Sequence, residues 1–219
     1  MHMQDYRKSG ELLNPEDWGY KKFTLLDRIN EIEYAIENKM YQSALALALT
    51  LPDICGKAEM PSAQVGMRYR AWFNKHVASL YMPKCILGME DPNRRIMTGD
   101  ICYALRCSYL HSGNDDIGNK GREAIISEYD TDHTITYKLI LTIDEDDNDG
   151  IECNTDNSTK EREYIVRINI PKMCCKICEA TRAYIRSHGD LSAFDESSIS
   201  VYSSKKWDRD RSSFFMENQ

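Results

Sequence analysis

The stretch from Asp100 to Gly113 most constrains how this chain folds, because its apolar residues recur at the spacing of a helix. Ile101, Leu105 and Ser108 fall along one side of this predicted helix. Thr98 is a suitable N-cap residue, and the glycine at the end of the stretch is suited to terminate the helix. The segment therefore predicts a buried helix with defined ends.

Two side chains of this stretch do not suit a plain core helix. Arg106 is a permanent cation that matches the geometry of a phosphate, and His111 exchanges a proton near neutral pH. They are five positions apart, which is about 140° around a regular helix, yet a long arginine side chain can still reach the histidine, within one chain or across a dimer axis. The ordinary alternative is that Arg106 pairs with a carboxylate such as Asp53 or Asp100, while His111 caps the helix.

The rest of the chain predicts further helices and two strands, and hence a mainly α fold of the α+β class. A helix begins after Thr24, with Asp27 completing an imperfect capping box, and the last long helix begins at Pro171. The strands pair most simply as a β-hairpin with a long acidic loop, inserted at about 134–170 before the last helix. The expected helices are 24–38, 41–55 (ended or kinked by Pro52), 62–81 and 171–187, and the strands are 134–143 and 163–170. The expected divisions are an N-terminal arm (1–23), a helical domain (24–189) and a polar tail (190–219).

The charge balance argues against a broad nucleic-acid surface. The chain has 28 Lys and Arg against 35 Asp and Glu, a net charge of −7, so any RNA contact has to be local. No segment reaches the roughly 18 continuous apolar residues of a membrane helix, and the first residues lack the apolar stretch of a signal peptide. Eight cysteines without an export signal indicate reduced thiols, and we expect a cytoplasmic protein without a membrane partner.

A resemblance to a known superfamily rests on the arginine-histidine motif. An arginine, four residues and a histidine near the end of an apolar helix resemble the HEPN superfamily, whose members are helical bundles, often dimeric, and many of them ribonucleases of toxin–antitoxin, CRISPR and phage-defence systems. The wider sequence also resembles a group of uncharacterised prokaryotic and phage proteins of this kind, over about residues 30–188. The segments that carry this second likeness are 43–59, 99–113 and 168–185.

The resemblance implies metal-independent cleavage of RNA without a cofactor. His111 would be the acid or base, Arg106 would hold the phosphate, and Asp53 and Ser108 would support them. Cys107 stands where active members of the superfamily tend to have a polar residue, so here the sequence departs from the pattern. The implied partners are a second copy of the chain, single-stranded RNA and an antitoxin or other protein. The alternative is a non-catalytic HEPN-like binding or assembly module, and a zinc- or thiol-based enzyme ranks third.

A separate group of basic residues predicts a groove for single-stranded RNA. Tyr69 and Trp72 lie among them in the sequence, and aromatic rings can stack bases while cations hold the backbone. The competing interpretation is the ordinary polar surface of an amphipathic helix. The candidate RNA-binding residues are Arg68, Arg70, Lys75, Arg94 and Arg95.

Two segments resemble metal sites only in part, and we predict no metal. Cys174, Cys175 and Cys178 lack a second pair of ligands at suitable spacing, so packing in a helix explains them better. In the acidic loop, a calcium-loop alignment that places Glu145 first has Glu where Asp is usual, and Asp156 at the twelfth position where Glu is usual. A solvated acidic loop is the preferred interpretation, with weak cation binding left open.

Overall fold

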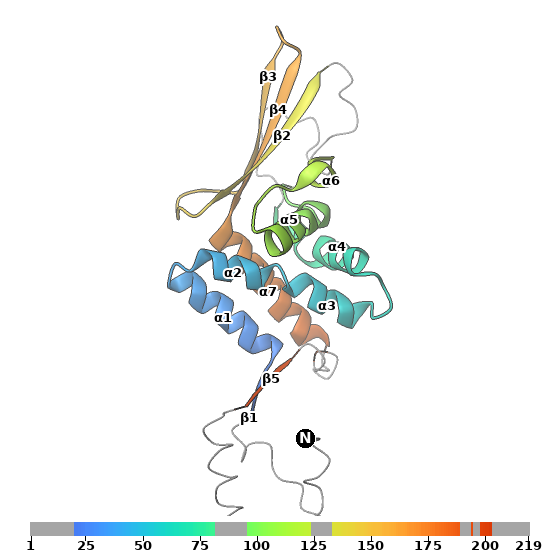
Figure 1. Cartoon of the computed structure of the whole chain (residues 1–219), viewed down its shortest axis with the longest axis vertical. Helices are drawn as coiled ribbons and strands as arrows, with labels where there is room; N and C mark the ends of the chain where they lie inside the picture. The colour runs from blue at the N-terminus through green and yellow to red at the C-terminus, as the bar shows by residue number, and fades with distance from the viewer. Residues whose placement is uncertain (1–19, 82–95, 124–132, 189–193, 195–197, 203–219) are drawn as a thin grey trace, which may run out of the picture.

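The computed structural model describes residues 20–81, 96–123, 133–188, 194 and 198–202. Within them, a bundle of helices carries a three-stranded sheet at one end and a two-stranded sheet at the other (Figure 1). The α+β class predicted from the sequence is confirmed. The helices are α1 (Leu25–Glu37), α2 (Tyr41–Ala48), α3 (Leu51–Glu59), α4 (Val65–His76), α5 (Gly99–Ser112), α6 (Gly118–Glu123) and α7 (Ile170–His188). The strands are β1 (Tyr20–Phe23), β2 (Thr134–Thr142), β3 (Gly150–Asp156), β4 (Glu161–Asn169) and β5 (Ile199–Tyr202).

The helix ends follow the local sequence signals. Thr24 caps α1, and its side chain and that of Asp27 form the reciprocal bonds of a complete capping box. Pro171 lies in the first turn of α7, where its missing N–H group leaves no helical bond unmade. The predicted bounds of both helices are therefore confirmed to within a residue or two. None of the described helices is both long and apolar enough to cross a membrane.

The helix predicted over 41–55, ended or kinked by Pro52, is interrupted slightly earlier than expected, because the chain breaks into α2 and α3 at Leu49 and Thr50. Pro52 cannot donate the hydrogen bond that would continue the first helix, so it lies in the first turn of the second instead. Thr50 secures the break: its hydroxyl donates to the Leu47 carbonyl (2.6 Å) and accepts from Arg28 Nη1 (2.9 Å). The predicted helix over 62–81 likewise divides into α4 and a short 3₁₀ turn, Ala78–Tyr81.

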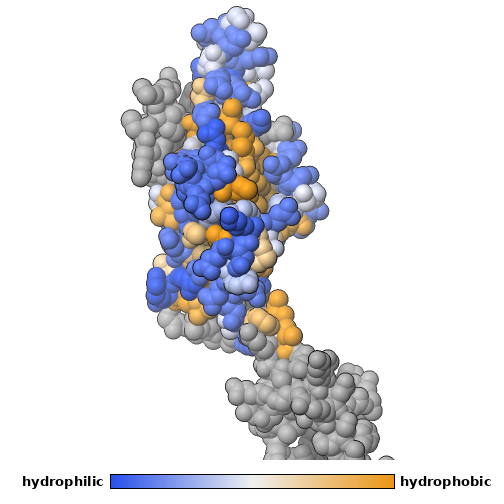
Figure 2. Space-filling model, turned by 90° about the vertical axis from the view of Figure 1, so that its left-hand side faces the viewer, coloured by the Kyte–Doolittle hydropathy of each residue, from blue (hydrophilic) through white to orange (hydrophobic). Residues whose placement is uncertain are grey.

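The pairing predicted for the long strands is wrong. β2 and β4 are parallel neighbours, and β3, which lies in the predicted loop, pairs antiparallel with the other side of β4. A tight turn at 157–160 joins β3 to β4, so β3 takes the hairpin position and β2 is left with the parallel edge. The tip of this sheet is covered by hydrophilic side chains, and hydrophobic ones appear further down, toward the helices (Figure 2).

The two ends of the described chain meet in the second sheet. β1 pairs antiparallel with β5, with Tyr20 opposite Tyr202 and Phe23 opposite Ile199. The predicted arm and the predicted tail thus each contribute one strand to the same small sheet, and the remaining parts, 1–19 and 203–219, lie outside the described residues.

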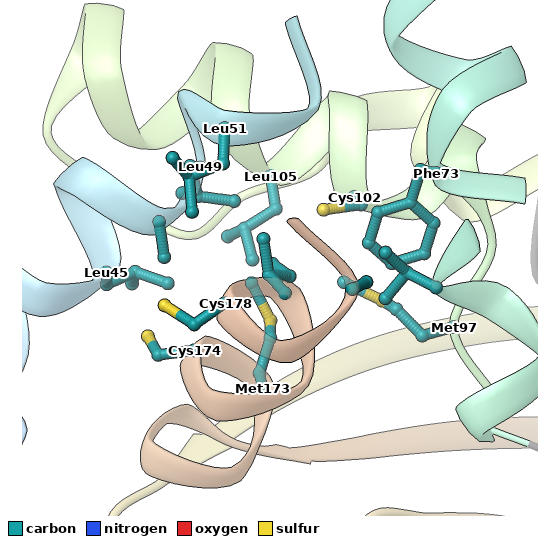
Figure 3. Close-up of a cluster of buried hydrophobic side chains, with 14 of the residues drawn as sticks. Leu45, Leu49, Leu51, Phe73, Met97, Cys102, Leu105, Met173, Cys174 and Cys178 are labelled. Carbon is teal, nitrogen blue, oxygen red and sulfur yellow. The ribbon is translucent and has the colours of Figure 1, made fainter. Parts of the chain in front are cut away.

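Helix α7 forms the centre of the core, where it packs against α1, α2 and α3. Cys174 and Cys178 face the same apolar cluster as Leu45, Leu49 and Met173 (Figure 3). Burial raises the pKa of Cys178 to about 12 and that of Cys174 well above its ordinary value, so both remain neutral thiols. Their predicted role in packing is confirmed, whereas Cys175 is exposed.

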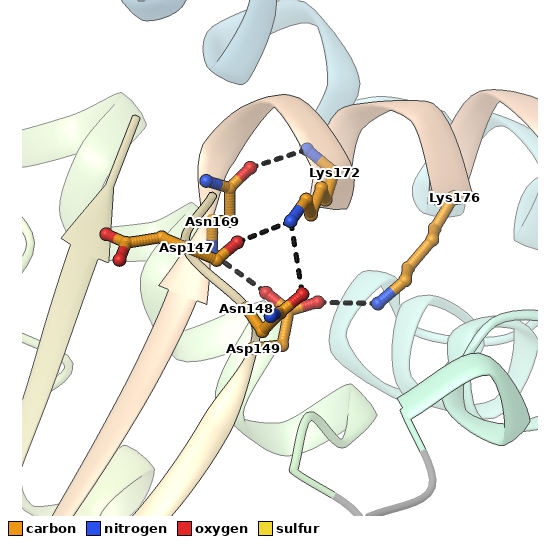
Figure 4. Close-up of polar contacts among 6 residues, drawn as sticks. All are labelled: Asp147, Asn148, Asp149, Asn169, Lys172 and Lys176. Carbon is orange, nitrogen blue, oxygen red and sulfur yellow. Dashed lines mark hydrogen bonds and ion pairs between the residues drawn. The ribbon is translucent and has the colours of Figure 1, made fainter. Parts of the chain in front are cut away.

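The acidic loop between β2 and β3 is held by two lysines of α7 (Figure 4). Lys172 Nζ donates to the Asp147 carbonyl (2.5 Å) and to Asn148 Oδ1 (3.2 Å), and Lys176 Nζ is 2.5 Å from Asp149 Oδ2. Lys176 thus binds an acidic side chain of the predicted calcium loop, and the second half of that loop is strand β3. No group of ligands suited to a metal ion occurs among the residues that the structure describes.

Replacing Asp149 with alanine is expected to lower the free energy of unfolding by about 2–3 kcal/mol. Asp149 is nearly buried, and its carboxylate also accepts from the backbone N–H of Asn169 (2.8 Å), so the change leaves an ammonium and a backbone donor unpaired. Urea unfolding measures the effect. The matched control is the exposed Asp146→Ala, expected to change the stability by less than about 0.5 kcal/mol. Equal midpoints for the two variants would contradict this role.

Candidate functional site

The site is built on α5, whose ends are fixed as the sequence predicted. Thr98 Oγ1 accepts from the N–H of Ile101 (3.4 Å), and the N–H of Gly99 donates to Asn74 Oδ1 on α4 (2.8 Å). Gly113 ends the helix in the left-handed conformation, with φ of 68°, which glycine adopts without strain. Ile101, Cys102 and Leu105 are buried against the bundle, so the helix is held firmly along one side.

Arg106 and His111 converge at the C-terminal end of this helix. Arg106 Nη1 lies 3.2 Å from His111 Nε2, and His111 is exposed. A guanidinium group only donates hydrogen bonds, so Nε2 is the acceptor in this contact, which requires the tautomer that carries its hydrogen on Nδ1. The pair therefore presents a cation beside an unprotonated imidazole nitrogen within reach of solvent.

Within the described part of the chain, the charge of Arg106 is not neutralised by an acidic side chain. No carboxylate of the described residues forms an ion pair with it, and its Nε is buried without a hydrogen-bond acceptor there. The guanidinium carbon lies 6.0 Å from the centre of the Tyr103 ring, and the negative end of the α5 dipole favours a cation here. An anionic ligand would complete this arrangement.

Asp53 does not support the pair. Its Oδ1 accepts from Arg68 Nε at 2.7 Å, so the carboxylate joins α3 to α4, and the expected pairing with Arg106 is wrong. Arg68 pairs with Asp53, although it is fifteen residues away in sequence, because α3 and α4 are direct neighbours in the bundle. Arg68 is correspondingly little exposed, at 13%, which removes it from the predicted RNA-binding surface.

Ser108 and Cys107 line a groove between α4, α5 and the start of α6. The Ser108 hydroxyl donates to the carbonyl oxygen of Asp116 and so fixes the turn after α5. Ser108 thus supports the end of the helix rather than contacting Arg106 or His111 directly.

Two other predicted RNA-binding residues, Arg70 and Lys75, lie in the described part of the chain, and both are paired with carboxylates. Arg70 lies 3.4 Å from Asp100, and Lys75 pairs with Glu59. Tyr69 and Trp72 are completely buried, so neither can stack on a base, and that part of the prediction is wrong. Arg94 and Arg95 lie outside the described residues.

The sequence did not single out Tyr103 as part of the site. The Tyr103 ring lies near two guanidinium groups, with the Arg70 carbon at 5.0 Å and the Arg106 carbon at 6.0 Å. Its position three residues before Arg106 was the available signal, because residues at this spacing are neighbours on a helix. Burial, reinforced by Cys107, raises the pKa of the Tyr103 phenol, which therefore stays protonated.

Comparisons with protein-family models, with curated proteins and with solved structures find no match for this chain.

Proposed function

We propose that this chain is a metal-independent endoribonuclease with a HEPN-like helical bundle, acting in prokaryotic or phage conflict systems. His111 is its acid or base and Arg106 its phosphate-binding residue. The observation that carries the proposal is the 3.2 Å approach of Arg106 to His111 at an exposed helix end, with no carboxylate of the described residues neutralising the arginine.

The chemistry follows from what each side chain can donate or accept. A phosphate that binds Arg106 replaces His111 as its hydrogen-bond partner and frees Nε2. Nε2 then takes the proton of the ribose 2′-hydroxyl, the 2′-oxygen bonds to the adjacent phosphorus, and the bond to the 5′-oxygen breaks. The leaving oxygen takes a proton from water or from an imidazolium of a second copy. The products are a 2′,3′-cyclic phosphate and a 5′-hydroxyl.

A homodimer is part of this proposal. One imidazole cannot be base and acid at the same instant, and a two-fold axis near the end of α5 would bring two Arg106–His111 pairs together. A protein such as an antitoxin would regulate the enzyme by covering this exposed helix end.

A non-catalytic binding or assembly module is the second candidate. The observation that favours it concerns the two residues that follow Arg106. The Ser108 hydroxyl donates to the Asp116 carbonyl and Cys107 lines the groove, so neither adds a polar group to the Arg106–His111 pair. In this case the chain binds RNA or protein at the same helix end without cleaving it.

Arg106→Ala is expected to slow cleavage of mixed single-stranded RNAs in EDTA by about 100-fold, because one preorganised donor to developing charge contributes about that much. Arg106→Lys should restore part of the rate, since it keeps the charge but not the planar donor pair. The matched control is Arg186→Ala, which removes an exposed arginine from the last turn of α7 and should leave the rate unchanged. RNA binding without cleavage by the wild type would favour the second candidate, and an equal rate in Arg106→Ala would contradict the assigned role.

A further inference from the structure

An open groove of about 1150 Å³ lies between α4, α5 and the start of α6. Its walls include Gly66 and Met67 from α4, Tyr103 and Cys107 from α5, and Asn119 from α6. His111 follows Cys107 by four residues, so it lies on the same face of α5, one turn beyond the groove. The groove and the Arg106–His111 pair are therefore neighbouring parts of one helix surface.

The charges divide the two parts by the kind of ligand that each accepts. Among the described residues that line the groove, the one cation is Arg70, which is paired with Asp100 at 3.4 Å, and a second carboxylate is Asp116. Arg106 instead has no carboxylate partner among the described residues. A phosphate is thus drawn to Arg106 and disfavoured in the groove, which suits a neutral group.

The apolar part of the groove suits a flat ring. The Tyr103 ring is half-buried, and Met67 is 59% exposed although it lies on a groove wall. The backbone of Gly66 packs closely on this ring and so fixes its position in the groove wall, because a side-chain carbon there would lie 3.1 Å from Tyr103 Cζ. Polar groups that can hydrogen-bond to the edge of a base, such as the Asn119 amide, complete the lining.

From this arrangement we infer that the groove binds one nucleobase of a single-stranded RNA, next to the phosphate held by Arg106. The inference rests on the proposed function and adds a base-binding subsite, with Tyr103 and Met67 as the contact residues. The 6.0 Å between the Tyr103 ring centre and the Arg106 guanidinium carbon lies within the span of one nucleotide. The subsite accepts a base through its ring face, so it binds RNA with little sequence preference.

The test compares two uncleavable oligomers: a labelled 2′-O-methyl single-stranded RNA and an abasic strand of the same length and charge. Fluorescence anisotropy with the full chain should show that the wild type binds the base-bearing strand about tenfold more tightly, as stacking of one base predicts. Tyr103→Leu should abolish this preference and leave the abasic affinity unchanged, while Tyr103→Phe should keep it. Met67→Ala, at an exposed position that tolerates truncation, should weaken the preference even if Tyr103→Leu unfolds.

The outcomes separate the subsite from the nuclease. Equal binding of both strands by the wild type, binding of neither, or an undiminished preference in Tyr103→Leu and Met67→Ala would overturn the subsite. A groove that serves a protein partner would give one of these results. Cleavage without a base preference overturns the subsite alone, and a base preference without cleavage supports the subsite while overturning the nuclease.

Discussion

Replacing His111 with alanine is expected to slow RNA cleavage in EDTA by about 1,000-fold, within the range that one positioned acid or base contributes. The exposed position of His111 at the helix end means that the substitution removes the imidazole without opening the core. RNA binding should change little, because Arg106 supplies the phosphate contact. Cleavage assays quenched at timed intervals measure the rate, and fluorescence anisotropy titrations measure RNA binding, so the two effects are measured separately.

Added imidazole should restore part of the cleavage rate of His111→Ala, which a purely structural role would not allow. The matched control is His188→Ala at the exposed end of α7, expected to cleave at the wild-type rate. An unchanged rate in His111→Ala would remove the residue from the mechanism. A loss shared equally by His188→Ala would indicate that the assay reports folding instead of catalysis.

Gly99→Ala is expected to lower the free energy of unfolding by about 3 kcal/mol, the upper part of the usual cost of overpacking. The added carbon would lie 2.6 Å from the carbonyl oxygen of Arg70 and 2.8 Å from its Cα. These are backbone atoms of α4, which cannot move aside as a flexible side chain would. The substitution therefore pushes apart α4 and α5, the two helices that hold the site and the groove.

Urea unfolding tests this prediction. The urea concentration at the midpoint of unfolding should fall, while the dependence of the unfolding free energy on urea concentration stays the same. Gly150→Ala is the matched control, since no atom lies within 4 Å of the added carbon there, and its effect should stay within about 0.5 kcal/mol. A midpoint for Gly99→Ala equal to that of Gly150→Ala would show that α5 does not need this close approach.

Local signals predicted the helix of the site better than its surroundings. Thr98, Gly113 and the apolar spacing between them determine α5 through contacts within a few residues, so its bounds could be predicted from the sequence. The partner of Asp53 could not, because Arg106 and Arg68 are chemically equivalent partners for a carboxylate and only the packing of α3 on α4 selects Arg68. The parallel pairing of β2 with β4 was missed for a similar reason, since it depends on β3 occupying the other edge.

The convergence of Arg106 and His111 could be predicted only in part from the sequence. Helical geometry alone separates the two residues by about 140°, so a regular helix with short side chains would keep them apart. The length of Arg106, together with the termination of α5 at Gly113, allows the 3.2 Å contact. The sequence therefore permitted the contact without requiring it. Tyr103 was missed because its role depends on Gly66 and Arg70 of another helix.

The chemical nature of the cleaved ends tests the proposed joint action of Arg106 and His111 most directly. Mass spectrometry of short single-stranded RNAs, incubated with the wild-type protein in EDTA, distinguishes the possible products. Attack by the neighbouring 2′-oxygen predicts fragments that end in a 2′,3′-cyclic phosphate and begin with a 5′-hydroxyl, and these should disappear with His111→Ala. Fragments with 5′-phosphate ends, or no fragments at high protein concentration, would contradict the mechanism.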